Sequence, residues 1–300
     1  MKNKKASGIA AIIVVAVIVI SGLLTTKYPK LMKMFSVSKD DVNPTVHFID
    51  VGQGDCSLIC SDGHNVLIDA GPKDAKDDVV EYLLKNNITA FDYVIITHPH
   101  ADHIGGMSKV LKEFKVKNLI MPDIPKELVP TSKSFEKLLN TIKENNIKVL
   151  KAVPGDRYDI GEDYFEILAP NKDYEDLNNE SVVTRFNLNK HHFLFMGDAQ
   201  TESEKDILNK FQDVSAEVIK VGHHGSRTST SNDFLGACNP QTAVIMCGDD
   251  NSYNHPHKQT VKKLENKGIT VFRTDEDGTI VMRAGTKITV TRGKFNEIFN

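Results

Sequence analysis

The most informative segment of this chain is Thr97-His98-Pro99-His100-Ala101-Asp102-His103. Three imidazoles and one carboxylate lie within it, directly after the apolar run 93–96. Imidazole nitrogens and carboxylate oxygens suit zinc, iron or manganese, and active-site residues commonly lie in loops at strand ends. The following Gly105-Gly106 lets the chain pass close to such a site without an intervening side chain. The segment therefore predicts a metal site at the end of a buried strand.

Around this segment, apolar residues recur with the periods of strands and helices. The predicted strands are 46–51, 56–60, 65–69, 93–97, 118–121, 148–152, 164–168, 181–188, 191–196, 217–221, 243–247, 270–273, 279–283 and 287–291. The predicted helices are 74–86, 104–114, 134–145, 201–211 and 257–267. Strands and helices are interleaved, and Asn189-Lys190 is a predicted hairpin turn. The pattern predicts an α/β fold with two mixed sheets covered by helices, without a second domain boundary.

The N-terminal part differs in composition from the rest. Residues 1–7 form a short basic tail, and residues 8–26 carry no charge and are mostly apolar. This run is at the short end of what spans a bilayer, and no Ala-x-Ala-like cleavage site follows it. We predict a retained transmembrane anchor at 8–26, with a cleaved signal peptide as the alternative. A polar linker at 27–44 and one folded domain at 45–300 then follow.

Charge is also distributed unevenly. Seven of the 37 basic residues and two of the 40 acidic residues lie within 1–44, which leaves the rest of the chain with a net charge of −8. A domain with this net negative charge is not expected to bind nucleic acid tightly through its overall charge, but it suits a protein that binds divalent cations. Lysines flank the apolar run on both sides, so the positive-inside rule discriminates weakly. The short tail favours a position of the folded domain outside the cytoplasm, on a single-pass anchor in the cell membrane.

The run 97–103 resembles the HxHxDH signature of the metallo-β-lactamase superfamily. Other segments that resemble motifs of this family, in the same order, are Leu67-Ile68-Asp69-Ala70-Gly71, Phe195-Met196-Gly197-Asp198-Ala199 and Val221-Gly222-His223-His224-Gly225-Ser226. These motifs are most similar to those of the hydrolase domain of ComEC competence proteins and its stand-alone relatives. Residues 50–55, 254–256 and 273–275 also resemble that branch. The resemblance covers roughly residues 45–291. It implies an αββα sandwich, the metallo-β-lactamase fold.

The resemblance further implies two divalent metal ions, zinc or manganese. The implied ligands are His98 and His100 for one ion, Asp102 and His103 for the other, and Asp198 as a bridge between them. A later histidine would complete the second site. His223, which follows a strand and a glycine, is favoured for this position, and His255 is the alternative. The imidazole that is not used would then contact the substrate.

Other residues receive roles around the metals. His224 and Ser226 would lie at the rim as donors to an anionic oxygen and, with Asp102 and Asp198, make up the predicted catalytic residues. Asp69 would support the ligand loop without binding metal itself.

Most members of the superfamily have a third histidine at the first metal, and this chain departs from that pattern. His191 and His192, the only histidines in the corresponding interval, lie beside the predicted hairpin turn and are interpreted as exposed polar residues. The corresponding stretch offers Asn178 and Glu180 as oxygen or amide groups. A first site with fewer imidazoles should select zinc less strongly and accept manganese. A β-lactamase proper is disfavoured for the same reason.

Two neighbouring metal ions can activate water and stabilise developing charge, so the expected reaction is hydrolysis. The ComEC-like resemblance implies a phosphodiester substrate, with single-stranded DNA as one candidate. We therefore predict a membrane-anchored phosphodiesterase or nuclease. One alternative is hydrolysis of another ester, such as a lactone or a choline phosphate on an envelope polymer. A catalytically silent surface-binding domain is a third hypothesis, and no protein partner follows from the sequence.

Overall fold

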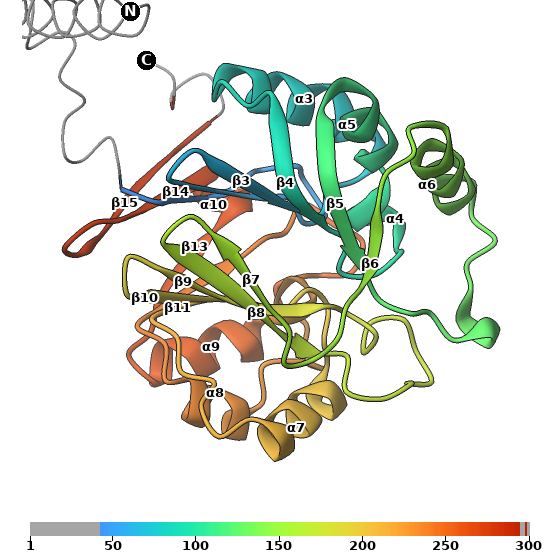
Figure 1. Cartoon of the computed structure of the whole chain (residues 1–300). Helices are drawn as coiled ribbons and strands as arrows, with labels where there is room; N and C mark the ends of the chain where they lie inside the picture. Colours follow the sequence, from blue (N-terminus) through green and yellow to red (C-terminus); the bar gives the residue numbers. More distant parts are fainter. Residues whose placement is uncertain (1–42, 295–297, 299–300) are drawn as a thin grey trace, which may run out of the picture. The chain divides into compact units, whose positions relative to one another are not determined.

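The computed structural model describes residues 43–294 and residue 298. The predicted anchor at 8–26 lies outside the described residues, as does the linker up to residue 42. Within the described part, no helix is both long enough and apolar enough to cross a membrane. The described chain folds into two facing β-sheets with helices on their outer sides (Figure 1).

The first sheet has the strand order β15-β14-β1-β2-β3-β4-β5-β6. Its strands are β1 (Thr45–Phe48), β2 (Ser57–Ser61), β3 (His64–Ile68), β4 (Ala90–Ile95), β5 (Lys115–Met121), β6 (Val149–Lys151), β14 (Thr279–Ala284) and β15 (Ile288–Gly293). The strands β3 to β6 are parallel, and the others pair antiparallel. The helices that accompany this sheet are η1 (Lys73–Ala75), α3 (Lys76–Lys85), α4 (Ala101–Ile104), α5 (Met107–Glu113), η2 (Lys126–Leu128) and α6 (Lys133–Glu144).

The second sheet has the order β13-β12-β11-β10-β9-β8-β7. Its strands are β7 (Arg157–Ile160), β8 (Asp163–Ala169), β9 (Val183–Leu188), β10 (His191–Phe195), β11 (Val218–Lys220), β12 (Thr242–Ile245) and β13 (Thr270–Arg273). The strands β10 to β13 are parallel. The helices on this side are α7 (Thr201–Lys210), η3 (Gly222–Gly225), α8 (Asn232–Cys238), α9 (Lys258–Asn266) and α10 (Thr274–Asp277).

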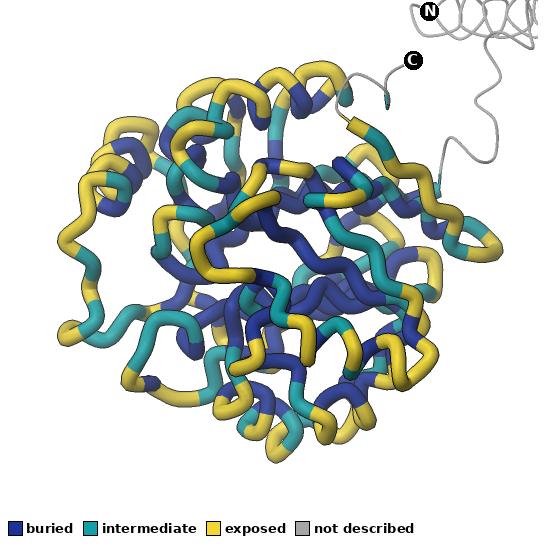
Figure 2. Tube along the Cα trace, turned by 180° about the vertical axis from the view of Figure 1, so that it is seen from behind, coloured by how far each residue is buried: buried dark blue, intermediate teal, exposed yellow. Residues whose placement is uncertain are grey.

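Strand periodicity explains how one chain fills three apolar layers. Successive side chains of a strand point to opposite faces, so Val66 and Ile68 pack between the sheets while Leu67 packs under the helices of the first sheet. On the second sheet, Phe193 and Phe195 face the inter-sheet core, and Leu194 faces the outer helices. The buried trace accordingly follows the strands, and exposed residues follow the outer turns (Figure 2). The predicted α/β fold with two mixed sheets is confirmed.

Some predicted elements differ in detail from the structure. The helix predicted at 104–114 is divided: α4 begins at Ala101, and α5 begins at Met107 after Gly105-Gly106. A Cβ on Gly106 would lie 2.3 Å from the carbonyl oxygen of Ala70, so the close approach expected of this glycine pair is present. The strand β7 and the helix α8 were not predicted. The turn at Asn189-Lys190 is confirmed, and both of its residues have positive φ, as in a type I′ turn.

The parallel strands also explain where a site can form. β3 and β4 end beside each other in the first sheet, and β10, β11 and β12 do so in the second. The carboxyl ends of parallel strands are the usual place for ligands in α/β sheets. The loops that follow these five strands contain nearly every predicted site residue.

Candidate metal centre

The loop after β4 presents its side chains through bonds to the neighbouring loop after β3. Asp69 accepts a hydrogen bond from the Thr97 amide at 2.9 Å and lies 2.7 Å from His103 Nδ1. The amide of Ala70 donates to the carbonyl of His103 at 2.8 Å. His103 thereby keeps Nε2 directed away from Asp69. Asp69 is fully buried and supports the loop from behind, and with Asp55 and His103 it also forms a third group of candidate ligands.

A first group of candidate ligands joins the two sheets. It comprises His98 and His100 from the loop after β4 and Asp198 from the loop after β10. His98 Nε2 lies 3.7 Å from Asp198 Oδ2 and 2.9 Å from His100 Nδ1. Ser181 fixes this arrangement, since its hydroxyl accepts the Asp198 amide at 3.0 Å and lies 3.3 Å from His98 Nδ1.

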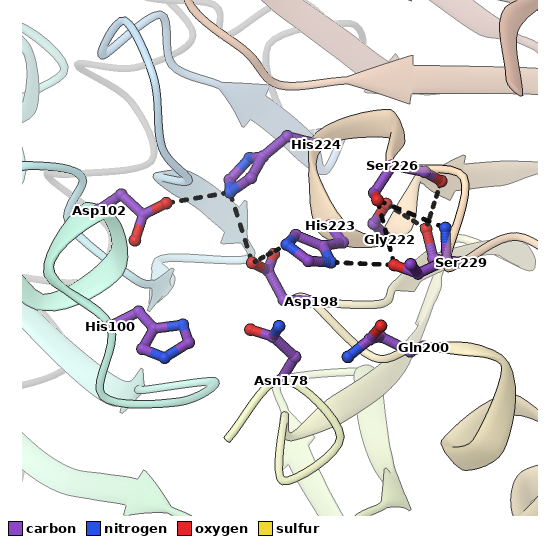
Figure 3. Close-up of polar contacts among 12 residues, drawn as sticks. His100, Asp102, Asn178, Asp198, Gln200, Gly222, His223, His224, Ser226 and Ser229 are labelled. Carbon is purple, nitrogen blue, oxygen red and sulfur yellow. Dashed lines mark hydrogen bonds and ion pairs between the residues drawn. The ribbon is translucent and has the colours of Figure 1, made fainter. Parts of the chain in front are cut away.

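A second group shares the same aspartate. It comprises Asp102, His103, Asp198 and His224. His103 Nε2 lies 3.4 Å from Asp198 Oδ1, and His224 Nε2 lies 3.5 Å from Asp198 Oδ2 and 3.2 Å from Asp102 Oδ2. Figure 3 shows Asp102, Asp198 and His224 directed toward one another. Because both groups contain Asp198, its carboxylate would be shared by any ions that the two groups hold.

In the structure His224 completes the second group, whereas the sequence-based choice for the last ligand was His223. Both residues lie in η3 with positive φ, 50° for His223 and 52° for His224. This tight left-handed turn sends His224 inward, where it is 1% exposed and its Nδ1 lies 2.9 Å from the Met246 carbonyl. His223 Nε2 stays 3.9 Å from Asp198 and its ring remains partly exposed at the pocket. His255, the alternative, belongs to neither group.

Beneath the second group lies a buried ion pair that sequence reasoning missed. The Lys220 ammonium on β11 contacts the Asp55 carboxylate and donates to the Gly197 carbonyl at 3.0 Å. Asp55 Oδ1 in turn lies 3.3 Å from His224 Nδ1. Both charged residues are almost fully buried, so each depends on the other. A lysine in the apolar segment 218–221, three residues before a motif histidine, was the available signal.

The charges and unpaired atoms of this region fit divalent cations. Asp198 Oδ1, His103 Nε2 and Asn178 Oδ1 are buried without a hydrogen-bond partner in the described residues. Burial alone would lower the pKa of His103, yet the carboxylates around it, led by Asp198, hold that pKa well above its usual value. The same balance raises the pKa of His224. Cations are favoured here, and a metal would take the place of protons on these imidazoles.

The two groups open into one pocket of about 370 Å³. Its walls include Asp102, Asp198 and His224 of the second group, His100 of the first group, and Asn178, His223 and His255. Asn178 and His100 line this pocket together, and Asn178 belongs to the stretch that was expected to offer an oxygen or amide group in place of a third imidazole. Gln53 and Tyr253 also line the pocket, and neither was singled out from the sequence.

Ser226 and Glu180, which were also predicted to belong to the site, lie outside both the pocket and the two groups. The Ser226 hydroxyl is buried and lies 3.1 Å from Thr228 Oγ1, so it is not a rim donor. The Glu180 carboxylate turns away and accepts a hydrogen bond from the Tyr174 amide at 2.5 Å. His191 and His192 lie on β10, away from both groups, and are half-buried instead of exposed.

Comparison with known families agrees with this geometry. The model of the metallo-β-lactamase superfamily matches residues 49–249. The chain belongs to this superfamily. Members of the superfamily bind divalent metals, and the groups around Asp198 fit such ions. The predicted two-sheet metallo-β-lactamase fold is confirmed.

Curated relatives of this metallo-β-lactamase domain include competence proteins. ComE operon protein 3 of Bacillus subtilis (strain 168) is 34% identical over 262 residues, which cover 81% of this chain and 33% of that protein. Recombination protein 2 of Haemophilus influenzae is 28% identical over 78% of this chain and 28% of its own length. Competence protein ComA of Neisseria gonorrhoeae is 27% identical over 79% and 32%. The chain thus spans about a third of the length of these relatives.

Solved structures with low identity share the fold. CmlA, a diiron β-hydroxylase from Streptomyces venezuelae, superposes with a TM-score of 0.55 at 13% identity, over 80% of this chain and 54% of that chain. YhfI from Bacillus subtilis, a metallo-β-lactamase fold protein, gives 0.53 at 13% identity, over 84% and 100%. Igni18, a metallo hydrolase from Ignicoccus hospitalis, gives 0.52 at 15% identity, over 79% and 98%. At these identities the likeness concerns the fold alone.

Proposed function

We propose that this metallo-β-lactamase domain is a metal-dependent phosphodiesterase that cleaves nucleic acid, with single-stranded DNA as a substrate. The observation that carries the proposal is the position of Asp198, which faces ligands of both groups within one open pocket. Two such sites can act together on an in-line displacement at phosphorus. The names of two relatives, competence protein ComA and recombination protein 2, point the same way.

The residues of the pocket have separable roles in this reaction. Divalent ions held by the two groups would supply an activated water and positive charge beside the attacked phosphate. Asp69 and Asp55 hold the imidazoles of His103 and His224 in place from behind. His223, with its Nε2 in the pocket region and its Nδ1 3.3 Å from Thr228 Oγ1, can contact an anionic oxygen of the substrate.

The ligands of the first group are compatible with manganese as the ion of the active enzyme. It contains two imidazoles and the Asp198 carboxylate, and the amide oxygen of Asn178, which has no partner among the described residues, lines the same pocket, whereas a third imidazole would increase the preference for zinc. Oxygen ligands suit manganese and magnesium better than soft metals. We therefore propose Mn²⁺ and Zn²⁺ as the ions to compare.

Nucleic acid would be recognised near the pocket, not along the lysine-rich region at 109–117. Lys109 contacts Asp77, Lys112 lies 3.9 Å from Glu144, and Lys117 lies 4.0 Å from Asp92. These lysines are partly neutralised on a solvated surface, and exposed ion pairs of this kind contribute little. The region therefore gives no continuous basic strip for a phosphate backbone.

We further propose that residues 8–26 tether the domain to the cell membrane, with the domain outside the cytoplasm. The support is the uncharged, mostly apolar run and the short basic tail before it. Protease added to intact cells should remove the domain while a cytoplasmic marker stays whole. Protection of the domain until the cells are lysed would contradict this orientation.

A substrate panel tests the proposed reaction. The purified full chain is stripped of metal, and Mn²⁺ or Zn²⁺ is restored before single-stranded DNA, bis-p-nitrophenyl phosphate, a lactone and a β-lactam are assayed side by side. We expect cleavage of both phosphodiesters and its loss in His98→Ala. Cleavage of the lactone alone would replace the phosphodiesterase with another esterase, and no turnover of any substrate would favour a silent binding domain.

A further inference from the structure

An exposed aromatic ring stands at the mouth of the metal pocket. Tyr253 is 62% exposed, the highest value for a large hydrophobic side chain among the described residues. It lines the pocket together with His100 and Asp198. Its ring stacks on that of His255, with 5.7 Å between centroids and 20° between planes. One face of Tyr253 is therefore covered by His255, and the chain leaves much of the rest of the ring to solvent.

The loop that carries this ring is held in one shape. Asn251 Oδ1 accepts the amides of Tyr253 at 3.2 Å and His255 at 3.0 Å. The Asn251 amide group donates to the Gly248 carbonyl at 2.9 Å. A planar ring on such a fixed loop loses little conformational entropy when it binds a second ring. Because the Tyr253 ring is largely exposed, it does not stabilise the fold by burial. Its position at the pocket therefore needs another explanation.

A second cavity adjoins the metal pocket on the other side of His255. It has a volume of about 870 Å³, and its wall includes Arg227 and Lys258. Neither of these two side chains forms an ion pair with another described residue. The N-terminus of α9 also faces this cavity through His257 and Lys258. Helix N-termini and unpaired cations both favour phosphate groups.

His255 connects the two spaces. It lines both cavities, is 9% exposed, and its Nδ1 has no hydrogen-bond partner among the described residues. A buried polar atom without a partner costs free energy unless a ligand or water satisfies it. Asp249 and Asp250 lie on the wall of the larger cavity as well, so its charge is mixed and does not by itself fix the ligand. The exposed ring of Tyr253 indicates which class of ligand binds here.

We propose that this region binds the nucleotide next to the cleaved bond, with its base stacked on Tyr253 and its neighbouring phosphate beside Arg227 and Lys258. The inference rests on the proposed function and adds to it a requirement for a base, because an isolated phosphodiester cannot use Tyr253. Stacking of a base on an aromatic side chain is tolerant of sequence. The substrate class is accordingly single-stranded nucleic acid with unpaired bases, cleaved without strong sequence preference.

The test compares two oligonucleotides that differ only in their bases. One is a short oligodeoxythymidylate, and the other has the same backbone with abasic tetrahydrofuran residues. For the wild-type chain we expect KM to be about tenfold higher for the abasic oligonucleotide. Tyr253→Ala should raise KM for the thymidylate by about tenfold and leave KM for the abasic one unchanged, with kcat within about twofold. Tyr253→Phe keeps the ring and should behave like the wild type.

The phosphate contact is tested with the same pair. Arg227→Ala combined with Lys258→Ala should raise KM for both oligonucleotides by the same factor, because both have the same phosphates. Lys262→Ala, an exposed lysine of α9 that does not line the cavity, is the matched control. As a readout without turnover, a 2-aminopurine oligonucleotide should lose fluorescence on binding metal-free wild type and Tyr253→Phe, but not Tyr253→Ala.

The outcomes separate the two proposals. If the wild type cleaves both oligonucleotides with equal KM, or if Tyr253→Ala leaves KM for the thymidylate unchanged, the nucleotide site is overturned and the phosphodiesterase stands. If the metal-restored chain cleaves neither oligonucleotide, the proposed function fails, and this inference fails with it.

Discussion

Asp198 contacts ligands from both groups through its two carboxylate oxygens. Burial would raise the pKa of this carboxyl, but the imidazoles of His224 and His103 outweigh burial and keep the pKa well below its usual value. The carboxylate form of Asp198 is therefore favoured, which is the form that could bind cations. The Ser181 hydroxyl and the turn at Gly197, whose φ is 53°, hold it in position.

The two adjacent histidines of η3 should differ in their effect on metal content. His224→Gln removes an imidazole that faces both Asp102 and Asp198, so we expect the bound metal to fall from about two ions to about one per chain. His223→Gln should keep both ions, because its ring lies farther from Asp198 and partly in solvent. Elemental analysis of the purified variants measures this. The reverse pattern would restore the sequence-based choice of His223.

Asp69 should matter for metal affinity although it lies behind His103 and does not line the pocket. Asp69→Ala removes the partner of His103 Nδ1 and of the Thr97 amide, and we expect metal affinity to fall by about 10–100-fold. Asp92→Asn is the control, since Asp92 also lies 3.1 Å from a histidine, His64, but outside the metal groups. Competition with a chromophoric chelator gives the affinities. Equal affinities for both variants would remove Asp69 from this role.

Residue types and order were enough to predict most of the candidate ligands, but not the choice between neighbours. In the HxHxDH run and the Gly-Asp motif, the motif itself identifies the candidate ligands by position. His223 and His224 are adjacent in sequence, and only the left-handed turn of η3 decides which ring points inward. Ser226 turned out to bond Thr228, and Lys220 paired with Asp55 across a distance in sequence that no spacing rule covers.

Strand ends bring the site together. The loops after β3 and β4 come from one sheet, and those after β10, β11 and β12 come from the other. The metal pocket therefore lies where the carboxyl ends of strands from the two sheets meet. The period of apolar residues predicts the strands, because alternation reports which face is buried. It does not predict short elements such as β7, half of whose residues are exposed. For the same reason, boundaries at Gly105-Gly106 depended on backbone contacts with other loops.

Strand β1 contains a histidine whose burial makes stability depend on pH. His47 lies 2.7 Å from the Tyr82 hydroxyl and 3.0 Å from Thr45 Oγ1, and burial lowers its pKa to about 4. A folded-state pKa below the unfolded value of about 6.5 means that stability is present above pH 6.5 and is lost as pH falls toward 4. Between pH 7 and pH 5 we expect the wild type to lose about 2 kcal/mol more unfolding free energy than His47→Gln.

Urea unfolding at the two pH values measures that difference. Because the other titrating groups are common to both proteins, the comparison isolates His47. Equal losses in the wild type and in His47→Gln would show that the imidazole is not held in its neutral form.

Three apolar layers hold the described domain together. The layer between the sheets includes a run of aromatic rings: Phe186 stacks on Phe165 with 4.9 Å between centroids, and Phe195 packs edge-on at 5.4 Å. This layer fixes the separation of the two sheets. It therefore also fixes the distance between the ligands that each sheet contributes to the metal pocket.

Removing one of these rings should destabilise the whole domain. Phe186→Ala leaves a cavity between the sheets, and we expect the unfolding free energy to fall by about 3–5 kcal/mol. Leu84→Ala, on the exposed side of α3 and 57% exposed, should change it by less than about 0.5 kcal/mol. Denaturant unfolding compares the two. A small effect for Phe186→Ala would mean that the sheets are held together mainly outside this layer.

We propose that metal bound around Asp198 drives the cleavage of phosphodiesters. The most direct measurement is the rate at which the metal-free full chain cleaves a single-stranded oligodeoxythymidylate as Mn²⁺ is titrated back. We predict no cleavage without metal, and a rate that rises and levels off near two ions bound per chain. Cleavage that persists without metal, or a fully metal-loaded chain that leaves the oligonucleotide intact, would contradict the claim.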